Sequence, residues 1–387
     1  MQHASGTARK FKRLRVFAVC KRGKLGAMTH FDDERERRLQ AIGWRPSATP
    51  VAVPPGQRLA RVIAQHRNGY VLHDGDEELT AQPAVRFLKR SLDPTERPAV
   101  GDFVLLAAGS PPTIEQVLPR RTTLSRAAAG ERHQRQLIAT NVDCVFVLMG
   151  LDGDFNPRRI ERYLVLIEGS GAQPVVVLTK LDKTADNGTR IADLHAALPG
   201  IELHAINAKD AQSVQPLTAH LRAGHTAVLV GSSGAGKSTL TNTLLGRERQ
   251  ATGAVRDSDS RGRHTTTHRA LIALPSGGCL IDTPGMRELK LTGDEDLGAA
   301  ATFGDIEALA LQCRFGDCTH GNEPGCAVRA ALQSGELDQT RWQAYQKLRD
   351  ELGAASEALE AQLKRKAAAR VANKALGKRL VDKYGRR

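Results

Sequence analysis

Gly231-Ser-Ser-Gly-Ala-Gly-Lys-Ser238 is the stretch that decides how this chain folds. It fits the pattern G-x-x-x-x-G-K-[ST], in which glycines let backbone N–H groups turn toward phosphate oxygens and the lysine reaches the β and γ phosphates. The apolar, β-branched run Thr226–Val230 before it predicts a buried strand, and Thr239–Leu245 after it places leucines on one helical face. Strand, loop and helix in this order predict a nucleotide site rather than an ordinary glycine-rich turn.

The pattern also predicts a role for each position of the loop. Lys237 is expected to act on the phosphates during catalysis, and Ser238 to place its hydroxyl on Mg²⁺. The nucleotide is expected to contact the following residues: Gly231, Ser232, Ser233, Gly234, Ala235, Gly236, Lys237, Ser238 and Thr239.

Length, composition and charge limit the class of protein. With 387 residues, 41% of them hydrophobic, the chain has room for two or three globular domains. No apolar run approaches the ~20 residues that span a bilayer, and no apolar stretch follows the basic N-terminus as in a secretory signal. We therefore expect a cytoplasmic protein without membrane contact. The formal charge of +14 indicates a polyanionic partner, with a merely soluble basic surface as the alternative.

The first third of the chain divides into an arm and a barrel. Residues 1–55 are predicted to be a basic, flexible arm, because Arg9–Lys24 carries eight Lys/Arg and no acid. Residues 56–120 consist of short alternating runs, and the predicted strands are Arg58–Ile63, Gly69–Leu72, Glu78–Val85, Asp102–Leu106 and Thr113–Val117. Such strands indicate a closed barrel of the OB type, which often binds nucleic acid, although an SH3-like barrel fits the periodicity nearly as well.

Residues 121–297 are predicted to form an α/β domain, since strand and helix patterns alternate from Asn141 onward. The predicted strands are Cys144–Leu148, Pro174–Leu178, Ile201–Ile206, Thr226–Val230, Ala270–Leu274 and Cys279–Ile281. The predicted helices are Pro157–Glu168, Ile191–Leu198 and Thr239–Leu245. A mostly parallel sheet follows, and motifs at the carboxyl ends of its strands are expected to meet at one edge.

Two of these strand-end motifs predict that the base is guanine. In Thr179-Lys180-Leu181-Asp182, a buried Asp182 would accept hydrogen bonds from the N1–H and N2–H₂ edge of guanine, where adenine has no such donors. The stem of Lys180 would lie across the base. Asn207-Ala208-Lys209 is a weaker, second base-contacting motif. Taken alone, the first motif could also be a Lys/Asp pair that caps the next helix.

A third motif predicts the γ-phosphate side of the site. In Asp282-Thr-Pro-Gly285 the Asp282 carboxylate would lie near Mg²⁺ and the Gly285 N–H would contact the γ-phosphate, so both are candidate catalytic residues. The motifs run in the order base, phosphate loop, switch, whereas an ordinary small GTPase begins with its phosphate loop. Because all of them lie at one edge of a parallel sheet, circular permutation would leave the site intact.

The group that orients the attacking water is predicted to lie elsewhere. The residue after Gly285 is Met286, where small GTPases often carry a glutamine. The candidate is His264, whose imidazole can orient a water at neutral pH, with a solvent-exposed loop histidine as the alternative. One of the neighbouring threonines is expected to bind Mg²⁺, and Thr266 is the candidate.

Residues 298–387 are predicted to form a small, α-rich zinc domain with a basic tail. Cys313-x4-Cys318-x-His320-x5-Cys326 supplies three thiolates and one imidazole, a closed set suited to one structural Zn²⁺ per chain, with scattered buried cysteines as the alternative. Ala361–Arg387 carries ten Lys/Arg against the single acid Asp382. We expect this helical tail to contact RNA, although a solvated helix would show the same composition.

Together these motifs resemble the RsgA family, the circularly permuted bacterial GTPases of small ribosomal subunit biogenesis. The resemblance covers residues 58–387 and is carried, besides the motifs above, by Phe155-Asn156, Arg162-Tyr-Leu164 and Arg263-His-Thr-Thr-Thr267. It implies GTP hydrolysis that is slow alone, stimulated by the small subunit with its 16S rRNA, and coupled to late maturation and release. The chain departs from the family pattern in Thr179, where asparagine is usual, and in its longer basic arm.

Two other functions fit parts of the sequence. An ATP-using P-loop protein or nucleotide kinase would share the phosphate loop, but Asp182 and the lack of a lid-like arginine cluster count against it. An RNA-binding protein with a purely structural nucleotide site would share the barrel and the zinc motif. We expect a GTPase that acts as a monomer on GTP. Comparing GTP with ATP binding separates it from the first alternative, and GTP hydrolysis with and without small subunits separates it from the second.

Overall fold

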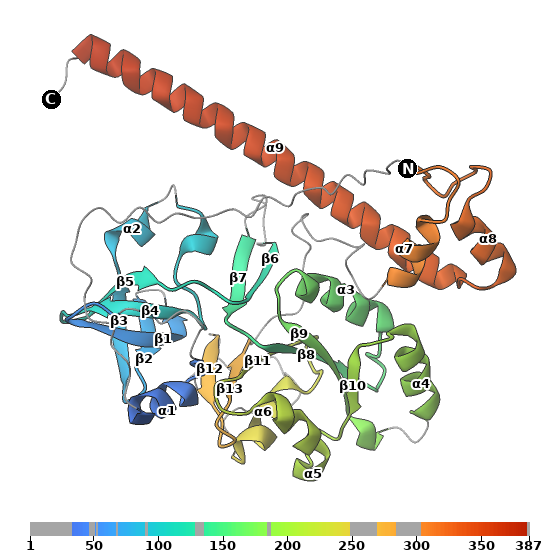
Figure 1. Cartoon of the computed structure of the whole chain (residues 1–387), viewed down its shortest axis with the longest axis horizontal. Helices are drawn as coiled ribbons and strands as arrows, with labels where there is room; N and C mark the ends of the chain where they lie inside the picture. The colour runs from blue at the N-terminus through green and yellow to red at the C-terminus, as the bar shows by residue number, and fades with distance from the viewer. Residues whose placement is uncertain are drawn as a thin grey trace, which may run out of the picture.

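A closed five-stranded barrel follows the N-terminal segment (Figure 1). The computed structural model describes residues 33–45, 51, 53–66, 69–89, 92–127, 135–183, 187–247, 269–283 and 303–384. The barrel strands are β1 Gln57–His66, β2 Gly69–His73, β3 Glu78–Pro83, β4 Phe103–Ala107 and β5 Thr113–Val117. They run in the order β1-β2-β3-β5-β4, with β3 parallel to β5, and β4 pairs back onto β1. This closure confirms the OB-type prediction.

A short helix packs under the barrel, where the sequence predicted only a flexible arm. Helix α1 spans Asp33–Ala41, and Leu39, Ile42 and Trp44 are buried against the barrel residues Leu59 and Phe103. The Trp44 and Phe103 rings meet edge to face with centroids 4.9 Å apart. The prediction failed for Asp33–Arg45 because these apolar side chains are scattered among charged ones. Residues 1–32, with the basic run, lie outside the described residues.

The nucleotide domain is built on a sheet with the order β10-β9-β8-β11-β13-β12. Its strands are β8 Cys144–Gly150, β9 Gln173–Thr179, β10 Glu202–Ala205, β11 Thr226–Gly231, β12 Ala270–Ala273 and β13 Cys279–Asp282. All neighbours are parallel except β12, which runs antiparallel to β13. The expected α/β architecture, with the circularly permuted order of its motifs, is therefore present.

Helices cover both faces of this sheet. One face carries α3 Pro157–Glu168 and α4 Gly188–Ala197, whose apolar side chains share a core with β8 and β9. The other face carries α5 Ala211–Val214, the 3₁₀ helix η3 Gln215–His220 and α6 Lys237–Leu245. Asn156 begins α3 by accepting a hydrogen bond from the Arg159 N–H. This layering leaves the carboxyl edge of the strands open for the loops that carry the motifs.

The barrel and the nucleotide domain share one sheet and one polar junction. Strand β12 pairs with β1 at Ala64 and Ala270, so the strands form a single eleven-stranded sheet. A hairpin of β6 Thr123–Ala127 and β7 Arg135–Thr140, which the sequence analysis did not anticipate, links the two domains.

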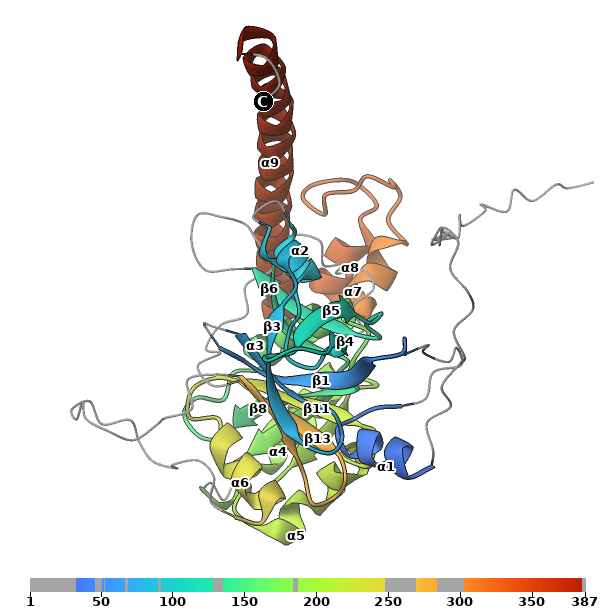
Figure 2. The same ribbon diagram turned by 90° about the vertical axis from the view of Figure 1, so that its left-hand side faces the viewer.

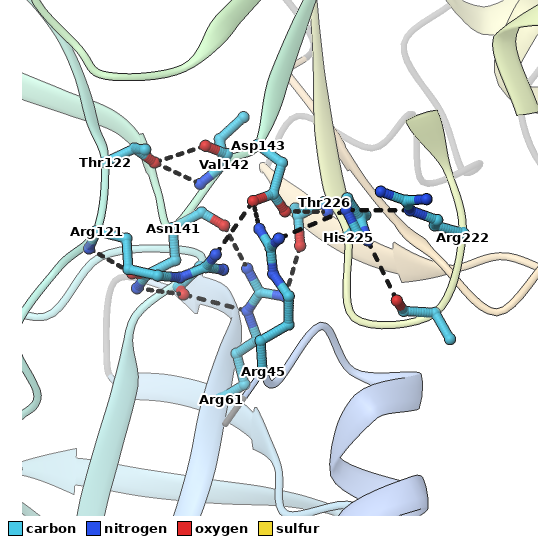
Figure 3. Close-up of polar contacts among 12 residues, drawn as sticks. Arg45, Arg61, Arg121, Thr122, Asn141, Val142, Asp143, Arg222, His225 and Thr226 are labelled. Atoms are coloured by element: carbon cyan, nitrogen blue, oxygen red, sulfur yellow. Dashed lines mark hydrogen bonds and ion pairs between the residues drawn. The ribbon is translucent and has the colours of Figure 1, made fainter. Parts of the chain in front are cut away.

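The junction centres on Arg61, which is completely buried (Figure 3). Its guanidinium donates to the carbonyls of Gly101 at 3.1 Å, Ile42 at 2.6 Å and Asn141 at 3.2 Å. It also donates to the Thr226 hydroxyl at 2.8 Å. A single side chain thus joins the barrel, the end of α1 and the strand β11.

The described residues of the C-terminal region, 303–384, contain three helices: α7 Gly304–Ala310, α8 Ala327–Ser334 and α9 Gln339–Tyr384. Phe303, Val328 and Trp342 share the hydrophobic core of α3. Ion pairs from Arg162 to Glu351, at 2.7 Å, and from Arg341 to Glu161, at 3.4 Å, add to this contact. Figure 2 shows α9 continuing far beyond the packed domains. Within the described ranges, no helix is long and apolar enough to span a membrane.

Candidate nucleotide-binding site

The phosphate loop lies between β11 and α6, as the sequence predicted. Gly231 ends the strand with φ 147°, and a Cβ atom there would come within 2.4 Å of the Leu148 carbonyl oxygen. Gly236 precedes the helix with φ 94°, a left-handed conformation that side chains disfavour. The glycines therefore serve close packing against β8 and the turn that aims the start of α6 into the site.

Lys237 is held at the first position of α6 and folds back over the loop. Its Nζ donates to the carbonyls of Gly231 and Ser232, each at 2.7 Å. Burial lowers the pKa of Lys237, while the nearby Asp282 carboxylate opposes that shift. The ammonium is thus placed over the loop, where phosphate oxygens could replace the two carbonyls as its acceptors.

Asp282 ends β13, next to β11, and is 4% exposed. The following Thr283 donates its hydroxyl hydrogen to the Leu229 carbonyl at 2.7 Å, which fixes the exit of β13 against the phosphate-loop strand. Asp282 therefore lies at the carboxyl edge of the sheet, near enough to Lys237 for its carboxylate to raise the pKa of that lysine. Gly285 and Met286 lie outside the described residues, as do His264, Thr266 and the rest of the first-switch stretch.

Thr179, which stands where the family pattern has asparagine, contacts the phosphate loop directly. Its side chain is completely buried and donates to the Ala235 carbonyl at 2.7 Å. A Cβ atom on Gly236 would lie 3.4 Å from the Thr179 hydroxyl oxygen. The threonine therefore supports the turn of the loop from the neighbouring strand β9.

The rest of the first base motif is positioned by an acidic residue that the sequence analysis missed. Lys180 has a left-handed backbone, φ 63°, and its Nζ pairs with Asp152 Oδ2 at 2.5 Å. This hydrogen bond holds the pKa of Asp152 below its ordinary value. Leu181 and Asp182 follow in a 3₁₀ turn, and both are exposed rather than buried. Asp182 is thus open to solvent. The selection of guanine that was predicted for a buried carboxylate therefore requires that a bound base covers Asp182.

The second base motif lies beside α6. Asn207 Oδ1 accepts a hydrogen bond from the Lys209 N–H at 3.1 Å, which closes a tight turn. Thr243, on α6, donates to the Ala208 carbonyl at 2.7 Å. The helix that begins at Lys237 and the loop after β10 are therefore joined by one hydrogen bond.

Asp154 is a further residue at the site that sequence reasoning did not single out. It accepts a hydrogen bond from the Ser232 hydroxyl at 2.5 Å and is paired with Arg159 at 3.0 Å. The Ser232 hydrogen bond holds the pKa of Asp154 below its ordinary value. The only sequence signal was the acidic Asp152-Gly-Asp154 turn after the strand β8.

The four predicted zinc ligands come together in the loop between α7 and α8. Their ligand atoms all lie within 4.8 Å of one another. Cys313 Sγ lies 3.9 Å from Cys326 Sγ, and His320 Nδ1 lies 3.6 Å and 3.5 Å from these two sulfurs. Tetrahedral zinc requires separations of about 3.8 Å and about 3.5 Å, so the residues fit the ion. The Trp342 ring packs edge-on against His320, with centroids 5.6 Å apart.

Known proteins that resemble this chain are GTPases, which agrees with the geometry of the site. A sequence profile described as RsgA GTPase matches residues 117–292. The small ribosomal subunit biogenesis GTPase RsgA of Xanthomonas euvesicatoria pv. vesicatoria is 54% identical over 365 residues, covering 90% of this chain and 97% of that protein. The chain belongs to the RsgA family. The RsgA protein of Xanthomonas axonopodis pv. citri is 56% identical over 331 residues, covering 83% of this chain and 90% of its own.

Two solved structures resemble the fold of this RsgA-family chain. YjeQ from Thermotoga maritima superposes with a TM-score of 0.56 at 25% identity and covers 76% of this chain and 98% of its own. YloQ, described as a circularly permuted GTPase, gives a TM-score of 0.54 at 26% identity and covers 76% and 95%. The resemblance predicted from the motifs is therefore confirmed, and the chain is a GTP-hydrolysing enzyme with a circularly permuted nucleotide domain.

Proposed function

We propose that this GTPase binds the small ribosomal subunit and hydrolyses GTP to time late subunit maturation and its own release. The observation that carries the proposal is the meeting of Lys237, Thr179 and Asp282 at one sheet edge, in a chain whose relatives are named small ribosomal subunit biogenesis GTPases. The subunit is expected to stimulate a slow intrinsic reaction. In this proposal the protein acts in the cytoplasm as a monomer.

Each end of the nucleotide has its own contacts in this proposal. Lys237 and the loop N–H groups hold the β and γ phosphates, and Asp182 selects guanine. Ser238, Thr266 and Asp282 hold Mg²⁺, which, when bound, neutralises charge on the phosphate oxygens. The position of Asp282 beside Lys237 supports this division.

His264 is the proposed water-orienting residue, because Met286 offers no useful hydrogen bond. If the rRNA orders the first-switch stretch, His264 enters the nucleotide site only when the protein is bound to the small subunit. The subunit would then stimulate GTP hydrolysis. In His264→Ala, GTP should bind normally while stimulated hydrolysis falls toward the intrinsic rate. Survival of the wild-type stimulated rate would show that the ribosome itself supplies the group.

The RNA contacts are assigned to the basic parts of the chain. The formal charge is +14, and the basic residues of the last part of α9 are in excess over acids. Such surfaces bind rRNA phosphates with release of counterions. The Cys₃His cluster holds one structural Zn²⁺ that shapes the domain from which α9 emerges.

The deciding experiment is GTP hydrolysis by the purified full chain, alone and with small ribosomal subunits. A large increase with small subunits, and little with large subunits, is expected. An ATP-using enzyme would instead prefer ATP in both conditions. A chain that binds subunits but never turns over GTP would be an RNA-binding protein with a structural nucleotide, and the proposal would be wrong.

A further inference from the structure

A second group of metal-ligating side chains lies at the edge of the nucleotide domain, away from the zinc cluster. Glu202 and His204 alternate along β10, the outermost strand of the sheet, so they point to the same face. His220 is the last residue of η3, which covers that face. The three side chains therefore come from two separate elements, and neither the phosphate loop nor the Cys₃His cluster uses them.

The three side chains converge on one carboxylate oxygen. His204 Nε2 lies 2.8 Å and His220 Nε2 lies 2.9 Å from Glu202 Oε1, and all three ligand atoms lie within 4.8 Å of one another. The other oxygen, Oε2, accepts a hydrogen bond from the Gln173 amide at 3.3 Å. The His220 ring is held edge-on by Phe146, with centroids 5.9 Å apart. The cluster is thus oriented by neighbours, as metal-binding carboxylates and imidazoles commonly are.

We propose that Glu202, His204 and His220 bind a divalent transition-metal ion of the zinc class. Two imidazoles and one carboxylate on one side of an ion are a known ligand set, and they suit first-row metals rather than Ca²⁺ or Mg²⁺. Ligands at ~2.1 Å from an ion are separated by about 3.0 Å at a right angle and by about 3.4 Å in a tetrahedral site, so the observed 2.8 Å and 2.9 Å require the side chains to move apart only slightly. The side chains are 37%, 23% and 16% exposed, which leaves room for water as the remaining ligands.

A metal-free explanation makes a different prediction. Two neutral imidazoles, each protonated on Nε2, could both donate to Glu202 Oε1, and the cluster would then be a hydrogen-bonded clasp. Glutamine in place of Glu202 would preserve that clasp, because its amide oxygen accepts the same two hydrogen bonds and its NH₂ can donate to the exposed Gln173 amide once that amide turns its oxygen inward. It would, however, remove the anionic ligand. Glu202→Gln therefore separates the two explanations while keeping the shape of the site.

The location gives the site a consequence for the nucleotide domain. Strand β10 leads directly into Asn207, and the Ile206 N–H is bonded to the Leu178 carbonyl at 2.7 Å, beside the first base motif. The segment after η3 leads into β11 and the phosphate loop. An ion at Glu202 would clamp the edge strand to η3, so it should raise the thermal stability of the nucleotide domain without contacting GTP.

The test is a zinc count on the purified full chain after equilibration with a small excess of Zn²⁺. Two equivalents are expected for the wild type, one at each cluster. Glu202→Gln and His220→Gln should each bind the second equivalent more than about tenfold more weakly. His195→Gln, which removes an exposed histidine of α4, is the matched control and should keep two.

A second measurement, of the melting temperature, distinguishes loss of the metal site from misfolding of a variant. Added Zn²⁺ should raise the melting temperature of the wild type and of His195→Gln, but not that of Glu202→Gln, whose melting temperature without added metal should match the wild type. A single equivalent in the wild type, or two equivalents retained in Glu202→Gln, would overturn the metal site. GTP turnover is not part of this readout, so its outcome is independent of the proposed function.

Discussion

Arg61 Nη1 donates a hydrogen bond to Thr226 Oγ1 at 2.8 Å, and this contact joins the barrel to the strand that carries the phosphate loop. Burial lowers the pKa of Arg61 to about 10, so the guanidinium remains charged at neutral pH. Around it, Asp143 accepts from the Thr226 N–H at 2.8 Å and pairs with Arg45 and Arg121 (Figure 3). The junction is therefore a set of charges whose partners come from both domains.

Loss of the Thr226 hydroxyl should destabilise this junction. In Thr226→Val the buried guanidinium loses one acceptor at nearly constant side-chain volume, which should lower the free energy of unfolding by about 1–3 kcal/mol. Thr226→Ser keeps the acceptor and should cost less. Urea unfolding measures both, and equal stabilities of the two variants would show that the hydrogen bond contributes nothing.

Replacement of Lys237 should abolish catalysis without unfolding the chain. Lys237→Ala removes an ammonium whose hydrogen bonds in the structure go to the loop carbonyls of Gly231 and Ser232, so no core packing is lost. Turnover should fall by orders of magnitude while the melting temperature stays within a few degrees of the wild type. Lys347→Ala, at an exposed position of α9, is the control and should hydrolyse GTP normally. Near-normal turnover in Lys237→Ala would place catalysis elsewhere.

The Thr179 side chain should matter through the phosphate loop rather than through the base. Thr179→Val leaves the Ala235 carbonyl without its donor, a loss of about 1 kcal/mol, so GTP and GDP affinity should both fall about fivefold. Thr179→Ser retains the hydroxyl and should bind nearly as well as the wild type. A selective loss of guanine over adenine discrimination, without weaker binding, would contradict this assignment.

Asp182 should decide which base is bound. In Asp182→Asn an amide donor replaces a carboxylate acceptor, so preference should move from GTP toward xanthosine triphosphate by at least about tenfold. Competition binding with the two nucleotides measures the shift. Asp193→Asn, at an exposed acid of α4, should leave the preference unchanged. If Asp182→Asn also leaves it unchanged, base recognition belongs to another residue.

Removal of zinc should affect the C-terminal region first and then reach α3. Cys318→Ser should destabilise that region by more than the ~1 kcal/mol of an average substitution, because a structural ion loses a ligand. The core that contains Cys326 and Trp342 also contains Ile160 and Leu164 of α3, so hydrogen exchange should rise there too. GTP affinity should change little, and Asp317→Asn should behave as the wild type. Freshly purified protein without zinc would contradict the assignment.

Much of the fold could be predicted because most helices and strands are indicated by a pattern within their own short stretch of sequence. The pattern in Pro157–Glu168 predicted α3 with its observed bounds, and the β-branched runs predicted every strand of the nucleotide sheet. Short-range rules did not reveal Arg61, Asp152 or Asp154, because a lone charged residue becomes significant only when the chain brings distant partners to it. Helix α1 escaped prediction for a similar reason: Leu39 in the helix, and Ile42 and Trp44 just after it, become a recognisable core only against barrel residues that are distant in the sequence.

The length of α9 sets how far apart the contacts of this chain with its proposed partner can lie. A helix of 46 residues spans about 69 Å, more than twice the width of a small domain. Its basic end is therefore carried far from α7 and α8, beside which the helix begins (Figure 2), so the tail and the packed domains can contact the proposed rRNA partner at well-separated places. Binding at one place then raises the effective concentration at the other, and modest contacts combine into avidity. In the proposed cycle, release would require both contacts to open within the same short interval, and GTP hydrolysis would act on that single step.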